Sequence, residues 1–129
     1  QDVADAVEPG DHAATFGAHP VSCAVAIEVF KTLSAPDFVA GVQEKSDYLF
    51  GKLNEIKDKH AQVTEIRGKG LIAGIVIKDT PAADSMAFFR DKGILVCVAG
   101  PDVIRFLPPL VIDKEHIDEA VAVLDEFLS

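Results

Sequence analysis

Two strand-like segments joined by a short glycine turn limit the folds open to this chain. Residues 63–66 alternate between apolar and polar side chains, and residues 71–77 (LIAGIVI) form a continuous apolar run of strand length. The segment Gly68-Lys69-Gly70 lies between them and is typical of a turn that connects two strands. Short strands joined by turns favour a small antiparallel or mixed sheet.

Helical patterns stand before, between and after these strands. Periodicity predicts helices over residues 20–33, 36–60, 81–92 and 114–128, and further strands over 94–98 and 103–106. The order α-α-β-β-α-β-β-α predicts an α+β domain with helices on one face of the sheet. The helix over 20–33 has only four polar residues, so we expect it to be mostly buried. In the helix over 81–92 we expect these side chains to face inward: Ala83, Met86, Ala87 and Phe89.

Length and charge exclude several classes of protein. The chain has 129 residues, enough for one domain with a real core. It carries 12 basic and 21 acidic side chains, a formal net charge of −9, which disfavours binding to nucleic-acid phosphates or anionic lipid. No apolar run approaches the ~18 residues of a membrane span, and no secretory signal pattern is present. Because the chain begins with Gln1 rather than Met, we expect it to be processed or cut from a longer protein.

The cysteines and histidines form no metal-binding or disulfide pattern. Cys23 and Cys97 lie in apolar stretches far apart in the sequence, so we expect two reduced, buried and unpaired thiols in a cytoplasmic protein. The four histidines lack the spacing of metal ligands, and we predict no metal site.

Two residues stand out as candidates for ligand binding. Arg105 lies in the apolar strand segment VIRFL, where a guanidinium that cannot lose its charge needs a carboxylate or phosphate partner. That partner is either a ligand carboxylate, which fits the guanidinium fork, or one of the chain's own acids. Alternatively, the side chain extends along a sheet edge so that its charge reaches water. Thr15 lies in a glycine-containing loop before a helix, where free N–H groups and the helix dipole favour an anion such as phosphate. Its alternative role is a hydroxyl turn that only shapes the loop.

Three motifs resemble those of class III pyridoxal-phosphate aminotransferases. Residues 9–20 (PGDHAATFGAHP) resemble the family's loop PG-x-H-x-[ST]-T-[FY]-G-G-N-P, and residues 66–71 (IRGKGL) resemble its segment IRG-x-GL. Residues 99–110 (AGPDVIRFLPPL) are similar to its RF-x-PPL segment, in the form typical of the acetylornithine aminotransferase branch. The motifs come in the family's order and span nearly the whole chain.

The resemblance implies a fold and a set of site residues. Residues 1–35 would belong to the end of the large cofactor-binding domain, and residues 36–129 would form the C-terminal small α+β domain of a fold-type I enzyme. In this family the Schiff-base lysine and the aspartate that holds the pyridine nitrogen lie upstream, so we expect no catalytic residue in this chain. Thr15 matches the threonine that contacts the cofactor phosphate from the neighbouring subunit of a homodimer. Arg105 matches the arginine that binds the substrate α-carboxylate, and Ala14 stands where the family has a Ser or Thr that touches substrate.

The function implied by the resemblance is amino-group transfer through pyridoxal phosphate in arginine biosynthesis, from N-acetylornithine to 2-oxoglutarate, by a cytoplasmic homodimer. Ala14, Ala18 and His19 depart from the family pattern, and the ornithine, 4-aminobutyrate and succinyldiaminopimelate aminotransferases stay open as alternatives. A non-enzymatic α+β module that binds carboxylates through Arg105, or a structural domain that packs through its first long helix, is also open. We interpret Arg67 as a structural residue of the turn. The chain alone is expected to fold, to self-associate through residues 1–35 and to be inactive.

Overall fold

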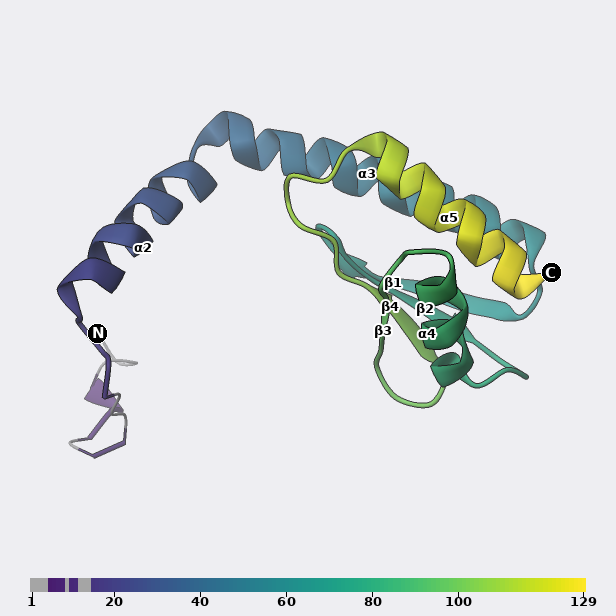
Figure 1. Ribbon diagram of the computed structural model, residues 1–129, viewed down its shortest axis with the longest axis horizontal. Coiled ribbons are helices and arrows are strands. Elements are labelled where there is room, and N and C mark those ends of the chain that lie inside the picture. Colours follow the sequence, from purple (N-terminus) through teal and green to yellow (C-terminus); the bar gives the residue numbers. More distant parts are fainter. Residues whose placement is uncertain (1–4, 9, 12–14) are drawn as a thin grey trace. The chain divides into compact units, whose positions relative to one another are not determined.

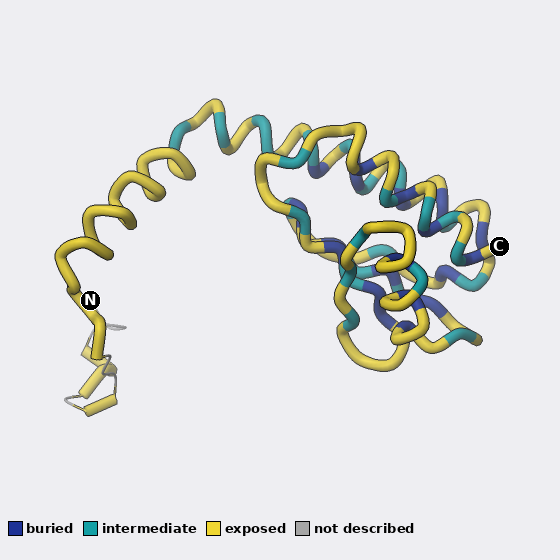
Figure 2. Tube along the Cα trace, in the orientation of Figure 1, coloured by how far each residue is buried: buried dark blue, intermediate teal, exposed yellow. Residues whose placement is uncertain are grey.

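The computed structural model describes residues 5–8, 10–11 and 15–129, and the chain divides into two compact units, residues 1–38 and residues 39–129. In the first unit, helix α2 (Pro20–Leu33) begins at a proline, whose missing N–H leaves one donor fewer to satisfy. None of the residues of α2 is buried, as Figure 2 shows along its whole length. The prediction of a mostly buried helix is therefore wrong for this chain. Its apolar side chains, such as Val25 and Phe30, are exposed, because an apolar pattern shows what a helix is able to bury and not what lies against it.

Four antiparallel strands form the sheet of the second unit, in the order β1-β2-β4-β3 (Figure 1). Their bounds are Val63–Lys69 for β1, Ile72–Ile77 for β2, Cys97–Val98 for β3 and Val103–Phe106 for β4. β1 and β2 form a hairpin that turns at Gly70, and β4 pairs with the other edge of β2, with Ile104 opposite Ile75. Of the two predicted kinds of sheet, the antiparallel one is therefore confirmed.

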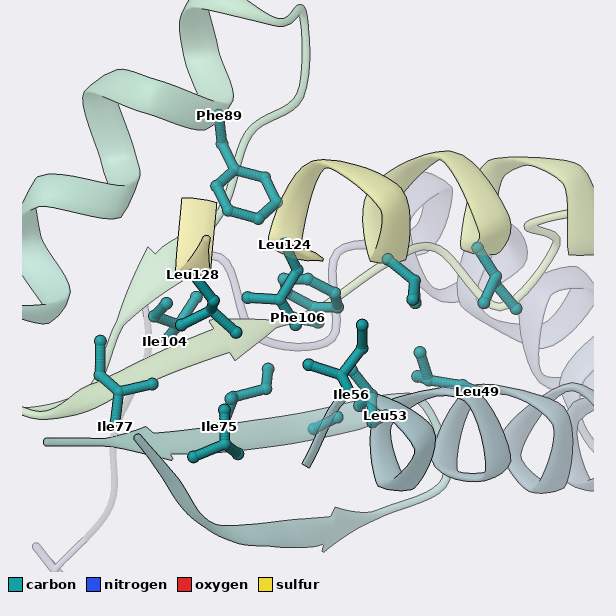
Figure 3. Close-up of a cluster of buried hydrophobic side chains, with 14 of the residues drawn as sticks. Leu49, Leu53, Ile56, Ile75, Ile77, Phe89, Ile104, Phe106, Leu124 and Leu128 are labelled. Carbon is teal, nitrogen blue, oxygen red and sulfur yellow. The ribbon is translucent and has the colours of Figure 1, made fainter. Parts of the chain in front are cut away.

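Helices α3 (Pro36–Lys59), α4 (Ala82–Asp91) and α5 (Lys114–Leu128) pack on one face of this sheet (Figure 3). Every second residue of β2 and β4 points into the core between sheet and helices. The buried side chains of the core are Ala73, Ile75 and Ile77 from β2, Ile104 and Phe106 from β4, Val63 from β1, Leu71 from the hairpin turn, and Leu49, Leu53, Ile56, Ala82, Phe89, Ile117, Val121, Leu124 and Leu128 from the helices. Each large apolar side chain contributes about 1.5–3 kcal/mol on burial, so this core holds the unit together. The predicted α+β order is confirmed.

Polar contacts join α3 to α5 along the exposed rim of the core. The Tyr48 hydroxyl donates to the Asp118 carboxylate at 2.7 Å. Further along, the Asp125 carboxylate lies 2.5 Å from His60 Nε2 and 2.5 Å from Lys59 Nζ. Hydrogen bonds from His60 and then Lys59 hold the pKa of Asp125 below its usual value. These contacts tie the C-terminal end of α3 to the last turns of α5.

The inward face of α4 differs from the prediction. Ala82, Ser85 and Phe89 are buried, whereas Met86 is 45% exposed. A serine can take an inward position here because its hydroxyl donates to the Ala82 carbonyl at 2.6 Å, which satisfies the polar group locally. Of the four side chains predicted to face inward, only Phe89 does so. The other three are exposed: Ala83, Met86 and Ala87.

Two strand boundaries also differ from the prediction. Strand β3 covers only Cys97–Val98 of the predicted range 94–98, because the Ile94 N–H bonds to the Phe89 carbonyl at the end of α4 and not to another strand. Strand β1 extends through Gly68 to Lys69, so the turn is shorter than the glycine-rich segment suggests.

Candidate carboxylate-binding site

One row of residues crosses the face of the sheet opposite the core. Arg67 on β1 lies opposite Gly74 on β2, Gly74 lies opposite Arg105 on β4, and Arg105 lies opposite Cys97 on β3. Residues directly opposite each other in antiparallel strands project to the same face. None of the four belongs to the core cluster. We call these four residues the arginine row.

Gly74 occupies a crowded position in the middle of the arginine row. A Cβ at this position would lie 3.3 Å from Val103 Cγ1 and 3.5 Å from Arg67 Cγ, so the stem of Arg67 lies against the glycine. The guanidinium of Arg67 pairs with the Glu65 carboxylate at 3.7 Å, and both side chains are more than half exposed. Arg67 is therefore a strand residue with its own counter-charge, rather than the turn residue that we predicted.

Arg105 has a buried donor without a partner. Its Nε has almost no solvent contact and no hydrogen-bond acceptor. The residue also takes part in none of the ion pairs found among the described residues. An unpaired buried donor costs about 1–3 kcal/mol, which a ligand carboxylate would remove by accepting from the guanidinium fork. Of the two partners predicted for Arg105, an acid of its own chain is not found in the part that the structure describes.

Thr15 begins the turn that leads into α2. Residues 15–18 form this turn, Ala18 has a φ of +58°, and His19 at the N-cap makes no side-chain hydrogen bond to the helix. The His19 side chain therefore does not cap the first turn of α2, and the N-terminus of a helix favours an anion such as phosphate. Ala14 lies outside the described residues.

The two cysteines are free thiols, and both are exposed rather than buried as predicted. Cys23 belongs to the uncovered helix α2, and Cys97 lies on the sheet face opposite the core. Sequence reasoning missed the place of Cys97 and Gly74 beside Arg105, because that place depends on strand register. The available signal was a glycine inside an apolar strand, which often marks a close approach of neighbouring groups.

Thr15 and Arg105 belong to different units of the chain, so each is a candidate site by itself. Within residues 5–8, 10–11 and 15–129, no three His, Cys, Asp or Glu side chains gather so as to hold a metal ion. The same residues include no helix long and apolar enough to cross a membrane.

Comparison with known proteins identifies the family of this chain. Residues 1–128 match the family described as Aminotransferase class-III, and the chain belongs to that family. Class III aminotransferases use pyridoxal phosphate. The predicted family and cofactor class are thus confirmed.

Several acetylornithine aminotransferases are similar to this chain in sequence. The one from Caldanaerobacter subterraneus subsp. tengcongensis is 40% identical over 122 residues, which are 95% of this chain and 31% of the relative. The probable mitochondrial acetylornithine aminotransferase of Dictyostelium discoideum is 42% identical over 128 residues, 98% of this chain and 28% of the relative. The chain therefore spans about 30% of the length of these relatives.

Solved structures show the same fold. The acetylornithine aminotransferase of Elizabethkingia anophelis has a TM-score of 0.81 at 27% identity, over 98% of this chain and 33% of that one. The ornithine delta-aminotransferase of Plasmodium falciparum has a TM-score of 0.82 at 27% identity, also over 98% and 33%. The fold of this chain is thus similar to that of an acetylornithine aminotransferase and to that of an ornithine aminotransferase.

Proposed function

We propose that this chain works as part of an acetylornithine aminotransferase, which moves an amino group from N-acetylornithine to 2-oxoglutarate in arginine biosynthesis. The observation that carries this proposal is Arg105, whose buried Nε lacks an acceptor on the sheet face opposite the core. An amino acid and a 2-oxo acid share an α-carboxylate, and a guanidinium binds this planar group with two parallel hydrogen bonds. The names of the relatives at about 40% identity support the choice of N-acetylornithine.

Arg105 holds the α-carboxylate in this proposal and so fixes the orientation of the amino group next to it. Val103 and the stem of Arg67 lie close against Gly74, so this position beside Arg105 favours a residue without a Cβ. Pyridoxal phosphate, when bound, supplies the electron sink for chemistry at the substrate α-carbon. The Thr15 hydroxyl and the first N–H groups of α2 hold its phosphate. Ala14 has no side-chain hydroxyl, so any contact there with substrate would come from its backbone.

We further propose that residues 1–35 complete a large cofactor-binding domain and that residues 36–129 form the small domain. Helix α2 supports this division, because its exposed apolar side chains require cover. In the proposed cytoplasmic homodimer, Thr15 serves the cofactor of the neighbouring subunit. The lysine that links the cofactor lies elsewhere in the protein, so the chain alone is inactive.

A comparison of amino donors tests the proposed substrate in the full-length enzyme. With 2-oxoglutarate as acceptor, we expect kcat/KM to be at least ~10-fold higher for N-acetylornithine than for ornithine, 4-aminobutyrate or N-succinyldiaminopimelate. A higher value for one of the other donors would assign the enzyme to that branch instead.

The substitution Arg105→Lys tests the role of the guanidinium. We expect kcat/KM to fall at least ~50-fold with a higher KM for the amino donor, because a point charge cannot replace the bidentate fork. Arg90→Lys is the matched control, since Arg90 is exposed on α4 and lies 3.7 Å from Asp91. Unchanged kcat/KM in Arg105→Lys would overturn the assigned role. Carboxylate binding without any turnover would favour the non-enzymatic module.

A further inference from the structure

Cys97 lies directly opposite Arg105 in the β3–β4 pair. Opposed residues in antiparallel strands have Cβ atoms about 4.5–5.5 Å apart and project to the same face. The Cys97 thiol is free and exposed. The Cys97 side chain therefore starts one strand spacing from the start of the Arg105 side chain, whose Nε is buried and unpaired.

Of the positions next to Cys97 in the β3–β4 pair, only that of Arg105 carries a charge. On its own strand segment, the residues two positions away are Leu95 and Ala99, and the diagonal positions on β4 are Val103 and Leu107. All four are apolar. The other arginine of the row lies two strands further on and already pairs with Glu65. An anion that approaches Cys97 across this face therefore meets an uncompensated positive charge.

The spacing between the two strands sets the size of the anion. The Arg105 and Cys97 side chains start about 4.5–5.5 Å apart, so one small molecule is long enough to contact both. A disulfide whose sulfur lies two methylene groups from its carboxylate is of this size.

We propose that Arg105 and Cys97 together form a site for a small carboxylate-bearing disulfide, at which Cys97 becomes reversibly thiolated. The proposal rests on the proposed function, because it concerns regulation of the same carboxylate site. The Cys97 thiol loses its proton to solvent, and the thiolate attacks one sulfur of the bound disulfide. The disulfide's S–S bond breaks, a new S–S bond joins Cys97 to one half, and the other half leaves as a thiolate that takes up a proton.

Thiolation at Cys97 excludes substrate from Arg105. The half that stays on Cys97 keeps its carboxylate on the guanidinium, where the substrate α-carboxylate would bind. The disulfide is the oxidant, so a dithiol reductant reverses the reaction and frees Arg105. The site would then respond to the ratio of small anionic disulfides to thiols around the enzyme.

Disulfides of similar length but different charge test the proposed thiolation of Cys97 in the full-length protein. Anionic 3,3′-dithiodipropionate, neutral 2-hydroxyethyl disulfide and cationic cystamine are compared, with the thiolation rate at Cys97 read by peptide mass mapping. We expect the anionic reagent to react about 10-fold faster than the cationic one. Arg105→Gln should bring this ratio close to one, whereas Arg90→Gln, on exposed α4, should leave it unchanged. Equal rates for the three reagents, or a ratio that Arg105→Gln does not change, would overturn the proposal.

Two further measurements separate this proposal from the proposed function. 2-Oxoglutarate should slow thiolation by the anionic reagent, and activity lost on thiolation should return with dithiothreitol. Cys97→Ser should resist inactivation by the same reagent. If Arg105→Lys abolishes turnover but the charge preference is absent, only the thiolation site is refuted. If the charge preference is present but Arg105→Lys leaves kcat/KM unchanged, the assigned aminotransferase role is refuted.

Discussion

Replacing Gly68 by alanine should destabilise the second unit much more than the same change at Gly70, although both glycines belong to one short segment. Gly68 has a φ of +145°, and an added Cβ would lie 2.0 Å from the Ile72 carbonyl oxygen and 3.1 Å from Ala73 Cα. Both are backbone atoms of the hairpin, so no rotamer change can relieve the contact. Gly70 has a φ of +60° and open space around its added Cβ.

The magnitudes follow from these two environments. Gly70→Ala places an alanine in left-handed backbone, at a cost of about 1–2 kcal/mol. Gly68→Ala has two costs. The backbone strain is comparable to that at Gly70, and the added Cβ also displaces the hairpin, which breaks hydrogen bonds between β1 and β2 at about 1 kcal/mol for each bond. It also shifts Ala73, which lies opposite Gly68 and is fully buried in the core. We expect a total of about 4 kcal/mol for Gly68→Ala.

Urea denaturation of the chain and its two variants, followed by far-UV circular dichroism, measures the difference. Gly70→Ala should keep a folded baseline with a slightly lower midpoint. Gly68→Ala should show a much lower midpoint or no folded baseline at all. Equal midpoints in the two variants would refute the argument that the hairpin backbone, rather than the turn, requires a glycine.

Three further predictions concern packing, pH and association. Leu53→Ala should lower the free energy of unfolding by about 2–5 kcal/mol in urea denaturation, because Leu53 is fully buried, whereas Leu95→Ala at an 84% exposed side chain should change it by less than about 0.5 kcal/mol. The pKa of Asp125 is lower in the folded chain than in the unfolded one, so its carboxylate stabilises the fold above the ordinary pKa of a carboxyl. This stabilisation is lost as the pH falls through the lowered pKa, so in Asp125→Asn the free energy of unfolding should depend less on pH in the acid range. An unchanged pH dependence would contradict this. The chain alone should self-associate in light scattering through the exposed apolar side chains of α2, and Phe30→Glu should weaken this; a strictly monomeric chain would count against it.

The sequence predicts most of the elements because their patterns are local. The stripe of Ile117, Val121 and Leu124 repeats at helical spacing, and all three are buried as that spacing requires. The inward face of α4 was not predictable in the same way, because Ser85 satisfies its hydroxyl inside the helix and so behaves as a small core residue. Local patterns also cannot show what covers an apolar helix. The sequence correctly marks α2 as apolar, but burial depends on a partner that the described residues do not supply.

Local sequence patterns predict only part of the candidate site as well. Arg105 was identifiable because a permanent charge inside an apolar strand demands an explanation wherever the strand lies. Gly74 carries only the weaker signal of a glycine inside an apolar strand, and Cys97 is an ordinary member of an apolar segment. Their relation to Arg105 appears only when β2, β4 and β3 are set in register. Residues far apart in the sequence then become neighbours on one face.

The alternation of β4 explains how one short strand can serve both the core and a ligand. Ile104 and Phe106 point into the core, while Arg105 between them points to the opposite face. The two apolar neighbours fix the strand, so the guanidinium is held in place without an acidic partner of its own. A resident carboxylate would lower the cost of the buried Nε but would also compete with any ligand for the fork. An unpaired donor is therefore consistent with the carboxylate-binding role proposed for Arg105, and the buried side chains on the other face of the sheet stabilise the strand that carries it.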